Sequence, residues 1–550
     1  MKKDPPYICI VKGFQLVTSE DWYVKNQETL TRICHFFHCI ITHHIRKGAG
    51  LSSFRLNQCF IVKDEFMKTF IPENLDVDVI IKENPPQIKR FHKDKLISII
   101  SLIHEKYETL SKIRKGMEYA PIRSTIFQNN IAHDYTKYLD YLEKVGIIER
   151  DRCYQAGKYS MGYRLNETYR ETKIKANPDE VTYFPIIKKM RQKSGKKSTT
   201  IYPFMDKWFN HNLQIDLDKA LKLAEMNYEY ELEHPRYEET HSGFKMKNSI
   251  SSYNSTVMNI HKLAERQFNL SVDPTVFRYH SNLTNLKEDI RTCITYNNQP
   301  LVEIDIKNSQ PYFSTALFQT ENYSQNTEKQ KIILYKSENI TFQIQSTTNI
   351  TTKPTLPIPI HNYPSNHPLF LSPMLEKFLK KADREDIRVY VDLIGKGKLY
   401  ERINEIINDE LGINYDKKQL KKSVIFPVFF SSNHVIGQGR GYAKFKKIFR
   451  KYFPNVYEAF KIIKRNDKTA LACLLQRMES YMVIEVICRR IARERPDLPL
   501  FTIHDSIVTT QGNEQYVKSV MEEELERFVD IRSMLKINRW APEEVRRIAA

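Results

Sequence analysis

The chain has 550 residues, and its 85 lysines and arginines outnumber its 66 aspartates and glutamates, giving a formal net charge of +19. This length allows two to four domains with ample core, so folding does not require disulfide or metal cross-links. The positive charge favours a polyanionic partner such as nucleic acid. There is no run of about 18 apolar residues and no apolar signal-peptide stretch, so we expect a cytoplasmic protein without a membrane partner.

The eight cysteines are dispersed, which fits a reducing compartment better than a disulfide framework. Residues 32–44 (RICHFFHCIITHH) need separate attention, because helical spacing would bring thiol and imidazole groups onto one face as zinc ligands. The same residues alternate with Ile and Phe as in a buried amphipathic helix, and no CxxC pair is present. A structural helix is therefore favoured over a metal site formed by Cys34, His38, Cys39, His43 and His44.

Residues 1–115 mix short apolar runs with lysine-rich turns and end in a predicted helix over 93–115, without an indication of their role. A clearer pattern follows in residues 129–146, where apolar residues at helical spacing stop at Gly146, the expected residue after a helix. Residues 147–151 and 159–165 then read as two strands joined by a turn. Helix, strand, turn and strand resemble a winged helix, a fold that binds DNA or serves as a protein-interaction module.

The next segments alternate between linkers and helices. A basic run at 188–198 predicts a linker, and residues 215–231 and 249–268 read as helices rich in Lys, Glu and Leu or Met. Residues 320–370 are polar and contain prolines, which predicts a long insertion. A helical pattern returns over 386–408, and residues 534–540 (MLKINRW) read as a strand.

Two short predicted strands each deliver one aspartate. Asp305 lies in residues 301–312 (LVEIDIKNSQPY) and Asp505 in residues 501–510 (FTIHDSIVTT), each after β-branched and apolar residues. A single aspartate at a strand end is usually a turn former. Two carboxylates on neighbouring strands, however, suit a pair of divalent metals about 4 Å apart for in-line attack on a phosphoryl group.

Further segments surround the two acids in a particular order. Residues 277–291 (FRYHSNLTNLKEDIR) contain an arginine and an Asn-Leu step, and residues 416–430 (DKKQLKKSVIFPVFF) contain a basic residue, three others, Lys, seven others and an aromatic residue. Residues 446–464 form a predicted helix pair broken by an aromatic-Pro step. In this order, the segments resemble the family A DNA polymerases and the single-subunit phage and mitochondrial RNA polymerases over residues 277–540.

This resemblance implies an α+β fold with the palm, fingers and thumb of a right-hand polymerase, preceded by the winged-helix-like module. The implied domains are 1–115 (role unknown), 116–170 (module), 171–276 (linker and thumb-like helices), 277–319 (first part of the palm), 320–370 (insertion), 371–465 (fingers) and 466–550 (second part of the palm).

The resemblance also implies roles for individual residues. Asp305 and Asp505 would hold two Mg²⁺ ions, for which Mn²⁺ can substitute, and the backbone carbonyl of Ile306 would complete the metal shell. Lys421 would neutralise charge on the leaving pyrophosphate, with Lys417 as a second phosphate contact. Phe429 would stack near the new base pair, and the residues along the primer and template would be Arg278, Asn285, Gln476 and His504.

The identity of the sugar rests on three positions. Gln310 stands five residues after Asp305, where related DNA polymerases carry a glutamate that blocks a ribose 2′-hydroxyl and RNA polymerases carry a small residue. Gln310 is bulky enough to act as such a gate. Phe429 lacks the hydroxyl with which RNA polymerases sense the 2′-hydroxyl, which favours deoxynucleotides, whereas Ser506 favours the RNA polymerases.

The sequence thus predicts a template-directed polymerase that transfers nucleotides from (d)NTPs to a 3′-hydroxyl on a DNA template and primer. DNA synthesis is favoured, and the setting would be a mobile element in a bacterial or phage-infected cell. Two alternatives stay open: a primase or single-subunit RNA polymerase that makes RNA, and a DNA-binding replication initiator without catalysis. The presence of Asp305, Asp505 and Lys421 argues against the initiator.

Overall fold

The computed structural model describes residues 7–11, 14–18, 69–113, 117–155, 157–176, 186, 201–235, 237–240, 243–246, 248–318, 373–433 and 442–540. The chain divides into two compact units, Met1–Glu65 and Phe66–Ala550. The first contains an antiparallel pair, β1 (Tyr7–Val11) and β2 (Phe14–Thr18). The predicted Cys/His cluster, the basic linker and the polar insertion lie outside the described residues. None of the described helices combines the length and the apolarity needed to span a bilayer.

The N-terminal part of the second unit has its own hydrophobic core. Helix α4 (Lys93–Ile113) contributes Leu96, Ile100 and Ile103, at the spacing of one helix face. Residues 69–113 therefore share a core with the segment predicted as a module, so that the boundary expected near residue 115 does not separate two cores. The other elements are β3 (Phe70–Pro72), α3 (Val77–Glu83), β4 (Ala120–Pro121), α5 (Ser124–Asn130), α6 (Tyr135–Lys144), β5 (Ile148–Arg150), β6 (Gly162–Leu165), α7 (Glu167–Arg170) and β7 (Ile174–Ala176).

A three-stranded antiparallel sheet in the order β4-β6-β5 belongs to this core. Helix α6 ends at Lys144, and Gly146 follows with a φ of 74°, the left-handed conformation that commonly ends a helix. The predicted helix over 129–146 is thus shorter than expected, because its first residues belong to the end of α5 and to the turn between α5 and α6. Strands β5 and β6 lie within the two segments predicted as strands.

Two long helices, α10 (Leu217–Glu233) and α11 (Ser249–Ala264), confirm the helices predicted in this region. Helix α11 is tied to the N-terminal part by polar contacts. Lys262 pairs with Glu105 of α4 at 2.9 Å. Asn254 donates to the carbonyl oxygen of Thr172 at 3.1 Å and accepts from the amide of Ile174 at 3.0 Å. The two helices are therefore fixed to the N-terminal core by specific hydrogen bonds.

The central sheet has the order β15-β16-β14-β13-β8, and β17 pairs with the other side of β14. Strand β14 alternates, with Val302, Ile304 and Ile306 fully buried on one face and Glu303 and Asp305 on the other. The strands are β8 (Leu213–Ile215), β13 (Ile294–Tyr296), β14 (Gln299–Ile306), β15 (Phe501–Ile503), β16 (Ser506–Thr510) and β17 (Leu535–Arg539), the last within the segment predicted to be a strand.

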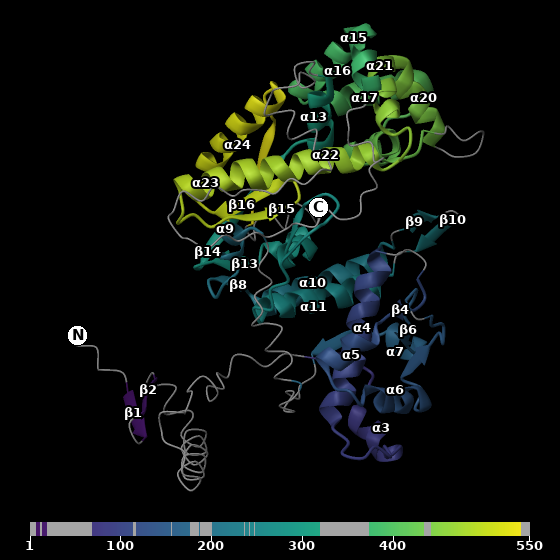
Figure 1. Ribbon diagram of the computed structural model, residues 1–550, viewed down its shortest axis with the longest axis vertical. Helices are drawn as coiled ribbons and strands as arrows, with labels where there is room; N and C mark the ends of the chain where they lie inside the picture. The colour runs from purple at the N-terminus through teal and green to yellow at the C-terminus, as the bar shows by residue number, and fades with distance from the viewer. Residues whose placement is uncertain are drawn as a thin grey trace. The chain divides into compact units, whose positions relative to one another are not determined.

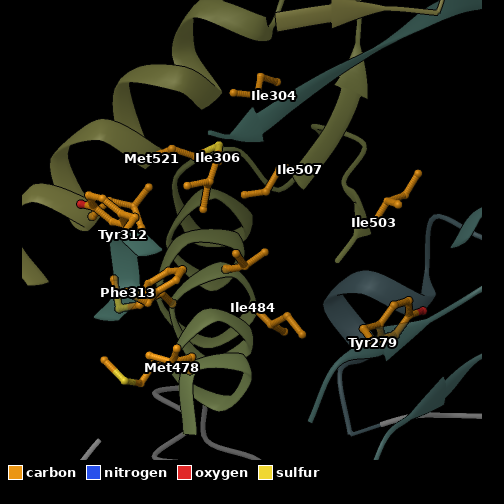
Figure 2. Close-up of a cluster of buried hydrophobic side chains, with 14 of the residues drawn as sticks. Tyr279, Ile304, Ile306, Tyr312, Phe313, Met478, Ile484, Ile503, Ile507 and Met521 are labelled. Carbon is orange, nitrogen blue, oxygen red and sulfur yellow. The ribbon is translucent and has the colours of Figure 1, made fainter. Parts of the chain in front are cut away.

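Helices cover the apolar face of this sheet. One is α24 (Glu514–Val529), and the other is a continuous helix made of α22 (Ala470–Ser480), the π-helical η7 (Tyr481–Cys488) and α23 (Arg489–Glu494) (Figure 1). Ile306 and Ile507 of the strands belong to the same buried cluster as Ile484 of the continuous helix (Figure 2). Because this face is closed by apolar packing, the polar side chains of β14 are left to the opposite face.

The segment after β14 is helical. Helix α13 (Ser309–Thr315) and η4 (Ala316–Phe318) follow the strand directly. The predicted helix over 386–408 is two helices, because Gly397 in a left-handed conformation (φ 69°) ends the first. The aromatic-Pro step is confirmed, since Pro454 starts the second helix of its pair. The helices are α15 (Pro373–Lys381), α16 (Glu385–Gly395), α17 (Leu399–Leu411), α18 (Lys417–Leu420), η6 (Lys421–Ile425), α19 (Phe426–Phe430), α20 (Tyr442–Tyr452) and α21 (Pro454–Ile463).

Short elements complete the described part of the chain. These are α9 (Pro203–Asp206), β9 (Tyr237–Thr240), β10 (Gly243–Met246), β11 (Ser271–Val272), β12 (Tyr279–His280), η3 (Asn282–Asn285) and α12 (Glu288–Arg291).

Candidate active site

Asp505 lies in a tight turn between two strands. Strand β15 ends at Ile503, β16 begins at Ser506, and these two residues are paired, so His504 and Asp505 form a two-residue hairpin loop. His504 has a φ of 55°, a left-handed conformation that non-glycine residues adopt at a cost but that histidine tolerates better than β-branched residues. The hydroxyl oxygen of Ser506 lies 2.9 Å from the carbonyl oxygen of Ile503 within this turn.

Asp305 lies beside this turn. On β14 it is paired with Ser506 of β16 on one side and with Lys536 of β17 on the other, so β14 and the turn bring the two aspartates together. Burial, and then the negative charges of Asp505 and Glu303, raise the pKa of Asp305 to about 7, against the opposing effect of Lys536 and Lys421. The positive charges of the two lysines therefore do not offset the burial of Asp305 and the negative charges beside it.

The pKa of Asp505 is also raised by burial and lowered by nearby positive charges. Burial raises its pKa, while a backbone hydrogen bond, the charges of Arg278 and Lys421 and the nearby hydroxyl of Ser309 lower it. Two buried carboxylates that repel each other are stabilised by a cation between them. Carboxylate oxygens are also the ligands that Mg²⁺ and Mn²⁺ prefer. The donor set therefore fits divalent metal ions.

The described residues do not supply a complete metal cage. No group of three or more His, Cys, Asp or Glu within them is arranged to hold a metal ion. Magnesium sites on phosphate substrates commonly use only one or two carboxylates, with the remaining ligands from phosphate and water. Ile306, the third proposed ligand, has a buried side chain at the end of β14 and has only its backbone carbonyl to offer.

Lys421 is the lysine of the predicted fingers helix whose charge reaches both aspartates. It begins η6, a π-helical segment between α18 and α19. A π-helix brings residue i+5 close to residue i, whereas an α-helix brings residue i+4. The ammonium of Lys421 accordingly lies 5.8 Å from the ring centre of Phe426. Lys417 is exposed on α18, with its ammonium 5.3 Å from the ring centre of Tyr400.

The π-helical segment changes the place of the predicted stacking residue. Phe429 is fully buried and packs on Phe460, with 4.8 Å between the ring centres. The structure therefore places Phe429 in the core and not on an open face, contrary to the expectation that it stacks on a base pair. The exposed aromatic residue of this helix is Phe426, which is 44% exposed.

Two buried lysines hold the end of this helix, and the sequence analysis did not single them out. Lys464 donates to the carbonyl oxygens of Val428 at 2.5 Å and Ser431 at 3.3 Å. Lys446 donates to the carbonyl oxygen of Ser432 at 2.7 Å. Burial, and then the charge of Lys446, lower the pKa of Lys464 to about 7. The positive charges stabilise the carbonyl groups that lack partners at a helix C-terminus.

Glu479 of α22 is a third acidic residue at the site, also missed by the sequence analysis. Its side chain is 1% exposed. Oε1 accepts from Arg278 at 2.9 Å (Nε) and 2.5 Å (Nη2), and Oε2 accepts from the hydroxyl of Ser309 at 2.8 Å and from Nε2 of Gln310 at 2.6 Å. Burial, and then the charge of Asp505, raise the pKa of Glu479 to about 7. Both oxygens of this carboxylate are therefore occupied by protein donors.

The predicted nucleic-acid residues separate into two groups. Arg278 and His504 lie at the acidic site: burial, and then the charges of Arg278, His280 and Arg291, lower the pKa of His504 to about 4, so its ring is neutral near pH 7. Within the described residues, neither Asn285 nor Gln476 forms a hydrogen bond with Asp305 or Asp505. Asn285 is exposed on η3, and Gln476 lies one helical turn before Ser480, whose hydroxyl donates to its carbonyl oxygen at 2.9 Å.

Glu303 supports the site from the same strand face as Asp305. It accepts from Ser506 at 2.7 Å and from the indole nitrogen of Trp540 at 3.1 Å, and it lies 3.7 Å from Arg291. Strand alternation alone places Glu303 on the face of Asp305, so a sequence signal for this residue existed. For Glu479 no local signal existed, because its partner Arg278 is 201 positions away.

Comparison with known proteins finds weak similarity to solved structures alone. No protein-family model and no curated protein matches this chain. Among solved structures, the chain is similar to the POL domain of Pol1 from M. smegmatis in complex with DNA primer-template and dNTP. The two are 10% identical, with a TM-score of 0.26, over 65% of this chain and 74% of that one.

Proposed function

We propose that the protein is a nucleic-acid polymerase that transfers nucleotides from a triphosphate to a 3′-hydroxyl. The observation that supports this most is the convergence of Asp305 and Asp505 from segments far apart in the sequence, with the charge of Lys421 acting on both. A buried and mutually repelling pair of carboxylates is costly to keep without a cationic partner. We choose nucleotide transfer among the reactions that such a metal site can perform because the surrounding segments resemble single-subunit polymerases.

The two aspartates would hold two divalent ions, which supply charge neutralisation at the transferred phosphoryl group and make the 3′-hydroxyl easier to deprotonate. Lys421 would bind triphosphate oxygens and stabilise the charge that develops on the leaving pyrophosphate. Lys417, exposed one helical turn away, would be a second phosphate contact. His504, with a lowered pKa, would act near the primer terminus as a neutral hydrogen-bond partner.

The class of sugar stays open. The amide nitrogen of Gln310 donates to Glu479, its Oε1 has no hydrogen-bond partner among the described residues, and Phe429 is buried. Gln310 therefore keeps the bulk on which its proposed role as a gate depends, and the test offers both kinds of nucleotide.

The N-terminal part is proposed to contact the template. Its order of helix, strand, two helices and two strands, with the sheet order β4-β6-β5, supports a winged-helix-like assignment. The loop between β5 and β6 carries exposed Arg152 and Lys158 together with Tyr154 and Tyr159, which are 64% and 53% exposed. Cationic and aromatic side chains together suit phosphate contact and base stacking.

Primer extension on a defined template, with dNTPs or NTPs and Mg²⁺, tests the proposal. We expect extension by the wild type and a loss of about a thousand-fold or more in Asp305→Asn and Asp505→Asn, with template binding nearly unchanged, because the acids serve chemistry and basic residues serve affinity. Asp392→Asn, on an exposed carboxylate, is the matched control. Extension by either active-site variant at wild-type rates would refute the assignment.

A further inference from the structure

Glu479 is a buried acid whose hydrogen bonds exclude a role as a metal ligand. A metal ligand needs a free lone pair directed at the metal, but both oxygens of Glu479 are occupied by donors from Arg278, Ser309 and Gln310. Two guanidinium nitrogens of Arg278 donate to the same oxygen, Oε1, at 2.9 and 2.5 Å, and both hydrogen bonds are charge-assisted. Glu479 therefore acts on the site through its partners.

Arg278 is the partner that matters for the acids. Its charge acts on Asp505 as well as on Glu479, and the guanidinium is hydrogen-bonded to Glu479. If Glu479 did not hold it, the guanidinium could turn to Asp505, on which its charge already acts. An arginine bound to Asp505 would occupy the oxygens that a divalent ion needs.

We propose that Glu479 is a positioning residue that holds Arg278 away from Asp505, so that Asp505 stays free to bind a divalent cation. The inference rests on the proposed function, because it takes the two aspartates as the cation site. Its chemistry is a competition between one guanidinium and one divalent ion for the same carboxylate, decided by a second carboxylate that binds the guanidinium more favourably.

The test measures cation binding directly, without turnover. Electron paramagnetic resonance of free Mn²⁺ gives the dissociation constant for the full chain in the absence of nucleotide. In Glu479→Gln, which keeps the shape of the side chain but loses its charge, we expect Mn²⁺ binding to weaken about ten-fold as Arg278 moves to Asp505. In Glu479→Asp, which keeps the charge, binding should remain closer to that of the wild type.

The decisive variant is the double substitution Arg278→Gln with Glu479→Gln. If the guanidinium is the competitor, removing it restores Mn²⁺ affinity to within about three-fold of the wild type, a non-additive result that a ligand role or a loss of packing would not produce. Glu149→Gln is the matched control: it removes an Arg–Glu pair of the same form, with Arg164 at 2.9 and 2.7 Å, in the N-terminal core.

The outcomes separate the inference from the proposed function. Absence of Mn²⁺ binding in the wild type would refute the cation site itself. Wild-type affinity in Glu479→Gln, or equally weak affinity in the single and double variants, would overturn the role of Glu479 while leaving the cation site intact. Thermal unfolding of each variant shows whether it is folded. If Glu479→Gln is not folded, Glu479→Asp is compared with the wild type. A Mn²⁺ affinity of Glu479→Asp lowered by about ten-fold, the loss expected for the uncharged variant, would contradict the charge argument.

Discussion

At the scale of single residues, the site depends on one unusual backbone conformation. His504 occupies the left-handed region in a two-residue loop, and this loop orients Asp505 toward Asp305. Left-handed backbone costs an ordinary residue about 1–2 kcal/mol, more for β-branched side chains and less for asparagine or glycine. The geometry of the acid pair is thus stabilised by the pairing of β15 with β16 against a local conformational cost.

We predict that His504→Val lowers nucleotide addition much more than His504→Asn. Valine opposes the left-handed conformation and displaces Asp505, whereas asparagine accepts it, so a difference of about ten-fold or more in kcat/KM is expected between the two variants. Steady-state primer extension measures this difference.

A control is available at the other end of β14. Asn298, with a φ of 60°, lies in the loop between β13 and β14 and is left-handed as well. Its distance from Asp305 is roughly 20 Å along the strand. Asn298→Val should lower the free energy of unfolding and leave the activity of the folded protein unchanged. Equal activity of His504→Val and His504→Asn would show that the turn does not position Asp505.

At the scale of elements, the helix from α18 to α19 combines a change of period with an anchored end. Its π-helical segment places Phe426 beside Lys421, and Lys464 holds the carbonyl groups at its C-terminus. π-Helical segments are uncommon and occur frequently at functional sites. The exposed face of this helix is therefore formed by Lys421 and Phe426, and the buried face by Phe429.

We predict that substitutions on the buried face lower stability and that substitutions on the exposed face weaken nucleotide binding. Phe429→Ala leaves a cavity in the core and should lower the free energy of unfolding by about 3–5 kcal/mol. Phe426→Ala removes an exposed ring and should change stability by less than about 1 kcal/mol, yet raise KM for the nucleotide. Chemical denaturation and nucleotide titrations measure the two quantities. A raised KM in Phe429→Leu, with Phe426→Ala unaffected, would return the stacking role to Phe429.

At the scale of the whole second unit, α11 is connected to the N-terminal part by the ion pair of Lys262 with Glu105 of α4 and by the hydrogen bond from Asn254 to Thr172. His104 on α4 is buried close to this contact, 1% exposed, and burial lowers its pKa from 6.5 to about 4. Glu108 lies 3.8 Å away, too far for a hydrogen bond, so burial outweighs the attraction of this carboxylate for a protonated ring. The folded protein keeps His104 neutral in a range of pH where the unfolded chain protonates it.

The sign of the resulting pH dependence is clear. Below pH 6.5 the unfolded chain binds a proton that the folded protein does not bind, so stability contributed at His104 is complete above pH 6.5 and is lost as pH falls toward 4. The loss approaches about 3 kcal/mol. We predict that His104→Leu flattens this part of the pH profile.

The comparison of wild type and variant isolates this effect. Midpoints of urea denaturation at pH 7.5, 6 and 5 should fall less steeply with decreasing pH in His104→Leu than in the wild type, a difference that other titrating groups, common to both proteins, do not produce. Parallel profiles for the two proteins would show that His104 is protonated in the folded state.

The sequence by itself determined the elements with a strong local pattern. Alternation predicted the strand of Asp305, helical spacing predicted α10 and α11, and Pro454 predicted the break between α20 and α21. The single strand predicted over 501–510 is instead a hairpin of β15 and β16, with Asp505 in its two-residue loop. Each of these signals depends only on neighbouring residues, because hydrophobic period and proline geometry act over a few positions. The burial of one strand face also follows from alternation, although the identity of the helices that cover it does not.

Only the tertiary structure decided which distant residues meet. The resemblance implied that Phe429 lies near a base pair, but tertiary packing buries it against Phe460 and leaves Phe426 as the exposed aromatic residue of this partly π-helical segment. Glu479 and Lys464 became visible only when packing brought them to Arg278 and Val428. Buried polar groups are stabilised by partners that the fold supplies from anywhere in the chain, and no local pattern encodes such partners.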